Sequence, residues 1–170
     1  LFDGFGSFDP DVIYNRIEYL ASGLECRVIF LDHLSILLSG LDGDERRMID
    51  STMTRLRSLV ERTGITLFLV SHLRRSNSDN NSHEEGGRVS LGQLRGSHSI
   101  SQISDCVIAL ERDQQSEDNN NITTVRVLKN RYSGEVGIAT RLTYDLSTCQ
   151  FYEAKDETEA TPIFDASTEF

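Results

Sequence analysis

The chain has 170 residues, of which 38% are hydrophobic and 26% charged, and 27 acidic against 17 basic side chains leave a formal net charge of −10. This length and composition predict one globular domain with a hydrophobic core, and the acidity argues against a generally basic coat for nucleic acid. No apolar run approaches the roughly 18 residues that cross a bilayer, which excludes a transmembrane protein, and no signal sequence is recognisable.

The three cysteines, Cys26, Cys106 and Cys149, are odd in number and far apart, and each lies in or beside an apolar run. This pattern is typical of reduced, buried thiols rather than of a disulfide framework or a zinc cluster, and it favours a reducing cytoplasm. Because the first residue is Leu1 rather than Met, we expect the chain to be a piece of a longer protein.

The first half of the chain predicts a helix followed by a strand–helix–strand unit. Residues 9–23 begin with Asp-Pro, end at a glycine and predict an amphipathic helix, and residues 44–64 predict a second one. Residues 27–32 and 65–70 are short, apolar and rich in β-branched side chains, which predicts parallel strands covered on both faces. The apolar stripe of the first helix is predicted to consist of Val12, Ile13, Ile17, Leu20 and Ala21.

The second half predicts a short helix and then a series of strands. The helix lies around Ile100 and Ile103, and the strands are separated by turns short enough for antiparallel hairpins at one edge of the sheet. The predicted architecture is therefore α/β, with a parallel centre and an antiparallel extension. The apolar runs are residues 105–110, 123–129, 138–144 and 149–152, and polar loops are expected at 76–88 and 114–121.

The last eighteen residues, 153–170, hold six acidic side chains against Lys155 alone and carry no helical or alternating apolar pattern. Such a segment buries too little apolar surface to offset its ordering entropy. The predicted organisation is one domain over residues 1–152 followed by a disordered acidic tail.

Polar residues follow the two predicted parallel strands at their carboxyl ends, where ligands bind in open parallel sheets. Asp32 could hold Mg²⁺ directly or through water, or it could simply cap the next turn. Ser71 and His72 follow the second strand, where the imidazole could contact a phosphate or a polarised water, or serve only as a hydrogen-bonded structural histidine.

Lys129 and Arg131 stand two residues apart at the end of a predicted strand, next to a hairpin turn. Two cations held in this way suit phosphate binding, and the guanidinium can make bidentate contacts. The alternative is a pair of solvated charges that discourages aggregation at a sheet edge. The chain contains no glycine-rich loop ending in Gly-Lys-Ser/Thr, so it cannot cradle a triphosphate by itself.

Six segments occur in a characteristic order along the chain. They are VIFLDH at 28–33, LVSHL at 69–73, EEG at 84–86, LRGS at 94–97, SDCVIALER at 104–112 and KNR at 129–131. Taken together, they resemble hexameric replicative DNA helicases with a RecA-like core (DnaB-type), and most of all the bifunctional primase-helicases of short-tailed phages. The resemblance covers about residues 10–152 and implies a C-terminal part of the helicase domain, with the phosphate-binding lysine and the catalytic glutamate located upstream.

The resemblance implies catalytic roles for four residues. Asp32 would be the Walker B carboxylate that organises Mg²⁺, and His72 would sense the terminal phosphate of ATP or dTTP. Arg131, supported by Lys129, would be an arginine finger that reaches the nucleotide of the neighbouring subunit in a ring of six or seven copies.

The resemblance also implies binding surfaces. Single-stranded DNA would contact loops 33–44 and 74–97, although the second loop has Asn, Ser and Asp where more lysine is expected. The acidic tail would dock on the replicative DNA polymerase. The residues implied are Arg112 and Tyr144 for the nucleotide base, Arg74, Arg75, Arg88 and Arg95 for DNA, and Glu169 and Phe170 for the polymerase.

These implications describe a motor that couples nucleotide hydrolysis to 5′-to-3′ translocation and duplex unwinding, in the host cytoplasm if a phage encodes it. The fragment alone is expected to be inactive. Two alternatives stay open: a non-catalytic module that holds DNA or a polymerase, and a recombinase-like ATPase of the same fold. A Gly-Lys-Ser/Thr loop upstream in the encoding gene would separate the motor from the non-catalytic module.

Overall fold

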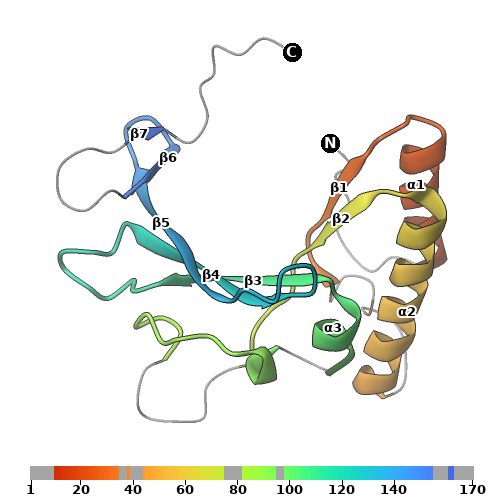
Figure 1. Ribbon diagram of the computed structural model, residues 1–170, viewed down its shortest axis with the longest axis horizontal. Helices are drawn as coiled ribbons and strands as arrows, with labels where there is room; N and C mark the ends of the chain where they lie inside the picture. The colour runs from red at the N-terminus through yellow and green to blue at the C-terminus, as the bar shows by residue number, and fades with distance from the viewer. Residues whose placement is uncertain are drawn as a thin grey trace. The chain divides into compact units, whose positions relative to one another are not determined.

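The computed structural model describes residues 10–34, 38, 44–74, 82–94, 98–154 and 161–162, and the chain divides into two compact units. The first unit lies within residues 1–74 and 94–104, and the second within 75–93 and 105–170. In chain order, the helices and strands are α1 (Pro10–Ser22), β1 (Val28–Leu31), α2 (Glu45–Thr63), β2 (Thr66–Leu69), the short 3-10 helix η2 (Leu91–Gln93), α3 (His98–Ile103), β3 (Cys106–Arg112), β4 (Ile122–Asn130), β5 (Gly137–Asp145), β6 (Gln150–Glu153) and β7 (Thr161–Pro162) (Figure 1).

The helix α2 has both of its ends specified by local sequence. At its start the Asp44 carboxylate accepts a hydrogen bond from the backbone N–H of Arg46 at 2.9 Å. At its end Gly64 adopts the left-handed conformation, with φ at 69°, and its N–H donates to the carbonyl of Val60 at 2.8 Å. These contacts satisfy backbone groups that a helix end leaves without partners, so the predicted bounds are confirmed.

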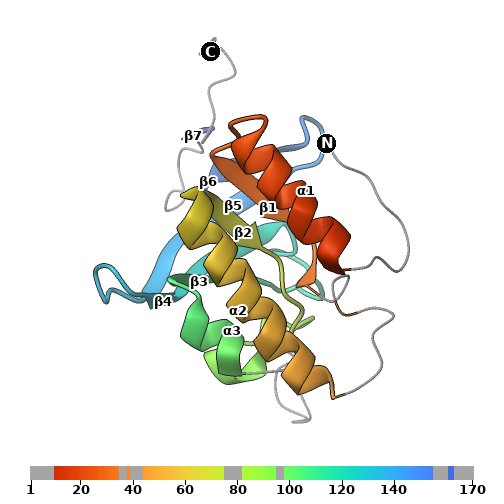
Figure 2. The ribbon, with the colours of Figure 1, turned by 90° about the vertical axis from the view of Figure 1, so that its right-hand side faces the viewer.

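In the first unit, β1 and β2 pair in parallel, with Leu31 opposite Leu69, and the helices lie along one face of this pair (Figure 2). The helix-facing side supplies the core, because Ile29 is buried together with the inner faces of α1 and α2. The best-buried side chains of these helices are Tyr14, Ile17, Ile49, Met53, Leu56 and Leu59. The predicted stripe of α1 was therefore partly wrong: Tyr14 is buried, whereas Val12 is 39% exposed.

The opposite face of the parallel pair is apolar and exposed in the part of the chain that the structure describes. Phe30 and Phe68 stack there, with ring centroids 4.6 Å apart, and Phe30 remains 71% exposed. The prediction that these strands are covered on both faces is wrong for the described residues. Alternation in the strands explains this, since Ile29 and Phe30 point to opposite faces.

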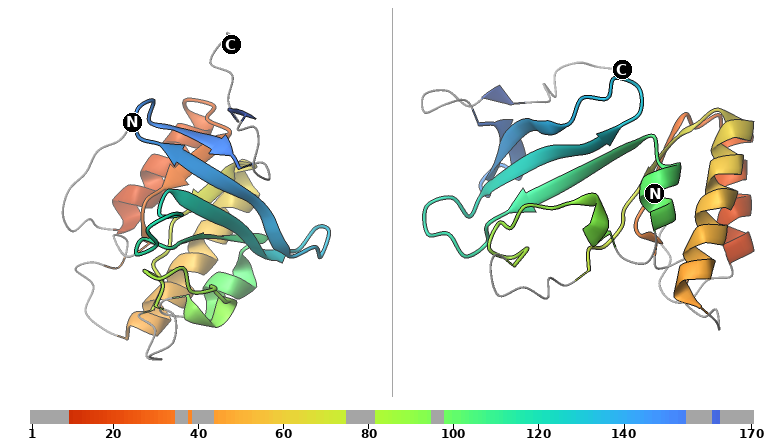
Figure 3. Two further views of the ribbon diagram at one scale, coloured as in Figure 1. Left: turned by 90° about the vertical axis from the view of Figure 1, so that its left-hand side faces the viewer. Right: turned by 60° about the horizontal axis from the view of Figure 1, so that its bottom comes forward.

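The second unit is an antiparallel sheet with strand order β3-β4-β5-β6-β7 (Figure 3). Register shifts between Val107 and Ile108 and between Val125 and Arg126 interrupt its ladders. Residues 82–93 run beside β3, where Gly87 and Val89 are buried. The α/β class is confirmed, but the antiparallel strands form a sheet of their own among the described residues rather than an extension of the parallel one.

The structure also bears on the predictions for the cysteines and for the acidic tail. The three cysteines are unpaired, as predicted, but Cys106 and Cys149 are exposed, so the expectation that they are buried was wrong. Of the predicted tail, Glu153 lies in β6 and Thr161–Pro162 form β7, while most of the remainder lies outside the described residues. Among the described helices, none is both long and apolar enough to span a membrane.

Candidate functional site

The carboxyl ends of β1 and β2 bring Asp32 and His72 to the same edge of the first unit. Pairing continues just past the strands, because the N–H of Val70 donates to the carbonyl of Leu31 at 3.0 Å and the N–H of Leu34 donates to that of Val70 at 2.9 Å. The side chains of Asp32 and His72 are exposed at this edge. This arrangement follows directly from parallel pairing, which aligns the ends of neighbouring strands.

His33, the first residue of the predicted DNA-contacting loop 33–44, lies against His72 in the structure. The two imidazole rings meet edge to face, with centroids 4.3 Å apart and an interplanar angle of 69°. The signal was present in the sequence, since His33 directly follows Asp32 at the strand end. His33 thus limits the orientations of the His72 ring.

A magnesium ion fits this edge in one specific way. The described residues contain no group of three carboxylate, histidine or cysteine side chains that could hold a metal by themselves. Mg²⁺ commonly keeps several waters and takes one or two carboxylates together with nucleotide phosphates, so the single exposed carboxylate of Asp32 is a suitable protein ligand. The donor set therefore fits a magnesium–nucleotide complex rather than a metal bound by protein alone.

Arg131 follows the end of β4, and two contacts to Asp105 hold it. Its guanidinium Nη1 lies 3.0 Å from the Asp105 carboxylate, and its backbone N–H donates to the Asp105 carbonyl at 2.9 Å. The Arg131 side chain remains 48% exposed, so it can still reach a ligand outside the unit. Lys129 lies within β4, opposite Val107, which places both cations at the same end of the strand.

Arg112 in β3 and Tyr144 in β5 both lie at the opposite end of the antiparallel sheet. Both are tied to the turn before β4: Arg112 Nε donates to the carbonyl of Asn120, and the Tyr144 N–H donates to that of Asn121 at 2.9 Å. The interaction with the Cys149 thiol is the largest of the effects that raise the pKa of Tyr144, so its phenol is neutral near pH 7.

Phe151 is a second aromatic residue at this end, and it was not among the predicted site residues. It is the cross-strand partner of Tyr144, and the two rings lie 4.9 Å apart at 51°. The hairpin register could have revealed it, because directly opposed side chains on neighbouring strands share a face. The pair forms an aromatic surface at the end of the sheet where Arg112 also lies.

The predicted DNA-contacting arginines are described only in part. Arg74 and Arg88 are exposed, and Arg88 stands between the buried residues Gly87 and Val89. The other two, Arg75 and Arg95, and the predicted polymerase contacts Glu169 and Phe170 lie outside the described residues.

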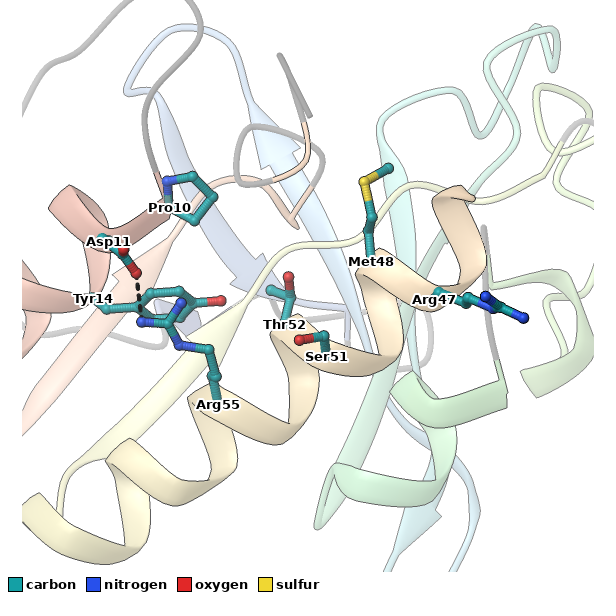
Figure 4. A pocket seen from close by; sticks show the side chains of 8 residues that line it. All are labelled: Pro10, Asp11, Tyr14, Arg47, Met48, Ser51, Thr52 and Arg55. Atoms are coloured by element: carbon teal, nitrogen blue, oxygen red, sulfur yellow. Dashed lines mark hydrogen bonds and ion pairs between the residues drawn. The ribbon is translucent and has the colours of Figure 1, made fainter. Parts of the chain in front are cut away.

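A pocket of about 380 Å³ opens between α1 and α2, and none of the predicted site residues lines it (Figure 4). Arg55 lies in it, paired with the Asp11 carboxylate at 2.6 Å and placed over the Tyr14 ring at 3.9 Å from the centroid. These contacts join the two helices, so we assign the pocket a packing role.

Comparison with known proteins places the chain. Residues 6–153 match the family described as DnaB-like helicase C terminal domain. The chain is 42% identical over 149 residues to a DNA helicase/primase of Enterobacteria phage T3, an alignment that covers 87% of this chain and 26% of that protein. The chain therefore spans about a quarter of that relative's length.

Solved structures support the fold. The ATPase domain of G40P is similar with a TM-score of 0.69 at 22% identity, over 91% of this chain and 54% of that one. A DnaB-like replicative helicase, solved in a study of its interactions with primase, gives 0.68 at 21% identity, over 88% of this chain and 36% of that one. With the family match over most of its length, the chain belongs to the DnaB-like helicase C-terminal domain family.

Proposed function

We propose that this chain is the part of a replicative helicase motor that carries Asp32, His72 and Arg131, and that the whole protein couples nucleotide hydrolysis to 5′-to-3′ movement on single-stranded DNA and to duplex unwinding. The observation that carries the proposal is the meeting of Asp32 and His72 at the ends of paired parallel strands. The family match and the relative from phage T3 support the same reading.

Each residue at the strand edge has a distinct task in this proposal. Asp32 would hold Mg²⁺ beside the phosphates of ATP or dTTP, where the ion would supply neutralisation of the phosphate charge. His72, oriented by His33, donates a hydrogen bond toward the terminal phosphate and so distinguishes the nucleotide before hydrolysis from the product. The chain lacks a Gly-Lys-Ser/Thr loop, so this part alone is expected not to hydrolyse nucleotide.

The second unit contributes to a neighbouring subunit's nucleotide in a homo-oligomeric ring, a hexamer or a heptamer. Arg131 stabilises the charge that develops in the transition state, with support from Lys129, and such fingers contribute roughly 10³ to 10⁵ in rate. Arg112 and Tyr144 enclose the base, and Phe151 extends the aromatic surface.

Single-stranded DNA passes along Arg74, Arg75, Arg88 and Arg95 in this proposal. A few cations in each of several subunits suffice despite the net negative charge, since the electrostatic contribution depends on local phosphate contacts. The acidic tail, ending in Glu169 and Phe170, docks on a basic surface of the replicative DNA polymerase. The protein works in the cytoplasm of the host cell.

Mixed rings of the full gene product test the proposal. Rings of Asp32→Asn subunits and rings of Arg131→Ala subunits should each lose DNA-stimulated hydrolysis by roughly a thousandfold, while Arg131→Ala rings keep nucleotide binding. Co-assembled at equal amounts, the two variants should regain up to about one quarter of the wild-type rate, because one neighbour supplies Asp32 and the other Arg131 across a head-to-tail interface.

The controls separate this outcome from a general loss of structure. Arg131→Lys keeps the charge without the bidentate fork, so it should stay impaired. Native mass spectrometry confirms that the variants mix in one ring. Normal hydrolysis by Arg131→Ala, or no recovery in rings shown to be mixed, would refute a finger acting between subunits.

A further inference from the structure

Glu111 is a buried carboxylate in the second unit that the proposed mechanism does not use. It lies in β3 with 8% of its surface exposed, and three hydrogen bonds converge on it. Arg126 of β4 makes a bidentate ion pair with it, from Nε to Oε1 at 2.8 Å and from Nη2 to Oε2 at 2.9 Å. The third donor is the backbone N–H of Val89, at 2.8 Å from Oε1.

These donors decide the charge of Glu111. Burial on its own would raise the pKa of this carboxyl and is the largest single effect, but the hydrogen bonds from Arg126 and Val89 and the charges of Arg126 and Arg88 together lower the pKa below its ordinary value. The carboxylate is therefore ionised near pH 7. A buried ionised group is stable only while its partners stay in place, so losing the hydrogen bond from the Val89 N–H would be energetically costly.

Two further contacts hold the same segment beside the carboxyl end of β3. Glu85 and Asp113 form an antiparallel bridge, in which the N–H of Gln114 donates to the carbonyl of Glu84 at 2.9 Å. Gly86 approaches so closely that an added Cβ would lie 3.0 Å from the Asp113 Cβ. Residues 84–89 are thus fixed along the carboxyl end of β3 (Figure 3).

Alternation links this attachment to two arginines with proposed functions. Val89 is buried and bound to Glu111, so Arg88 beside it is turned outward and exposed. Glu111 occupies the inner face of β3, so Arg112 beside it lies on the outer face. One carboxylate therefore joins the backbone that presents Arg88 to the strand that presents Arg112.

We propose that Glu111 is a positioning residue: by accepting the Val89 N–H it holds Arg88 in the orientation that contacts a DNA phosphate, on the same strand that carries the base-binding Arg112. This inference rests on the proposed function, and it adds a residue, Glu111, and a contact, to the Val89 N–H, that the proposed helicase mechanism does not include. The acceptor oxygen, not the ion pair alone, has this task.

Paired substitutions in the full gene product separate the acceptor from the ion pair. Glu111→Met with Arg126→Leu removes both charges and the acceptor, and apolar replacement of a buried ion pair is usually tolerated. Glu111→Gln with Arg126→Gln is the matched control, since it also removes the charges but keeps a carbonyl oxygen for Val89. Should the apolar pair fail to fold, the exchanged pair Glu111→Arg with Arg126→Glu replaces it, because it keeps the charges and lacks the acceptor.

The measurement is the salt dependence of binding to a fluorescent oligo-dT, in the presence of Mg²⁺ and a non-hydrolysable nucleotide. Each lost phosphate contact lowers the slope of log K against log salt by about 0.7 for a single strand. The apolar pair should lower the slope as much as Arg88→Ala does, and adding Arg88→Ala to it should change nothing more. The amide pair should keep the wild-type slope.

The outcomes distinguish this inference from the proposed function. If the wild-type protein does not bind the oligonucleotide, the proposed function fails. Suppose instead that the wild type binds and Arg88→Ala lowers the slope. The inference is then overturned if the apolar pair keeps the wild-type slope, or if adding Arg88→Ala to the apolar pair lowers the slope further, because Glu111 would not position Arg88. Hydrogen exchange of residues 82–94, faster in the apolar pair alone, provides an independent check.

Discussion

Gly86→Ala should lower the free energy of local opening of the segment that carries Arg88. Two effects contribute, the positive φ at this position and the close approach to Asp113. Gly86 has φ at +73°, where an L-residue costs roughly 1 to 2 kcal/mol relative to glycine. The new Cβ would also lie 3.0 Å from the Asp113 Cβ and 3.4 Å from its Cα, and overpacking of this kind costs about 1 to 3 kcal/mol. The free energy of local opening should therefore fall by about 2 to 5 kcal/mol in total.

Gly64→Ala is the matched control, because Gly64 has φ at +69° but no heavy atom within 4 Å of an added Cβ. It should cost only the conformational part, roughly 1 to 2 kcal/mol. Hydrogen exchange in the full gene product measures both, at residues 82–94 for one variant and at 58–66 for the other. With about 1.4 kcal/mol per tenfold change, exchange should speed up roughly 30- to 4,000-fold near position 86 and 5- to 30-fold near position 64. Equal acceleration in the two variants would refute the steric part of the argument.

Three more perturbations have defined expectations. Asp105→Asn should lower DNA-stimulated hydrolysis at most about fivefold, because its ion pair with the half-exposed Arg131 contributes no more than about 1 kcal/mol; a thousandfold loss in steady-state assays would contradict this. Ile49→Ala should destabilise the first unit by about 2 to 5 kcal/mol and Ile49→Val by about 0.5 to 1.5, as urea unfolding would show, since Ile49 is 2% exposed; equal effects would contradict the cavity argument. The stability that ionised Glu111 contributes should be complete above its ordinary pKa of 4.5 and should disappear as the pH falls through its lower folded-state pKa. Acid should therefore speed hydrogen exchange of residues 82–94 more in the wild type than in the Glu111→Gln with Arg126→Gln variant; equal acceleration would contradict this.

Local sequence signals predicted the elements well where the determining contacts are themselves local. The caps at Asp44 and Gly64 bound α2, and the parallel pairing that places Asp32 beside His72 follows from a strand–helix–strand order. The predicted stripe of α1 omitted Tyr14, which is buried, and the strand face that carries the exposed Phe30 was predicted to be covered. Both errors arise because periodicity identifies apolar positions but not which of them a neighbouring element covers.

In the candidate site too, local sequence signals identified single residues but not the long-range contacts between them. The sequence located Arg112 and Tyr144 separately, and a resemblance, not spacing, suggested that they act together. Their common attachment to the turn at 119–121, and the presence of Phe151 beside Tyr144, depend on a hairpin register that turn composition does not specify.

Helix caps, turns and apolar periodicity act within a few residues along the chain, so the α/β class, the order of the elements and the approximate extent of each strand could be predicted from the sequence alone. Contacts between residues far apart in the chain were needed to show that, among the described residues, the antiparallel strands form their own sheet, that His33 lies against His72, and that Glu111 joins β4 to Val89. Glu111 is the clearest case, because its partners are 15 and 22 residues away in the chain and only burial makes an acceptor at that position indispensable.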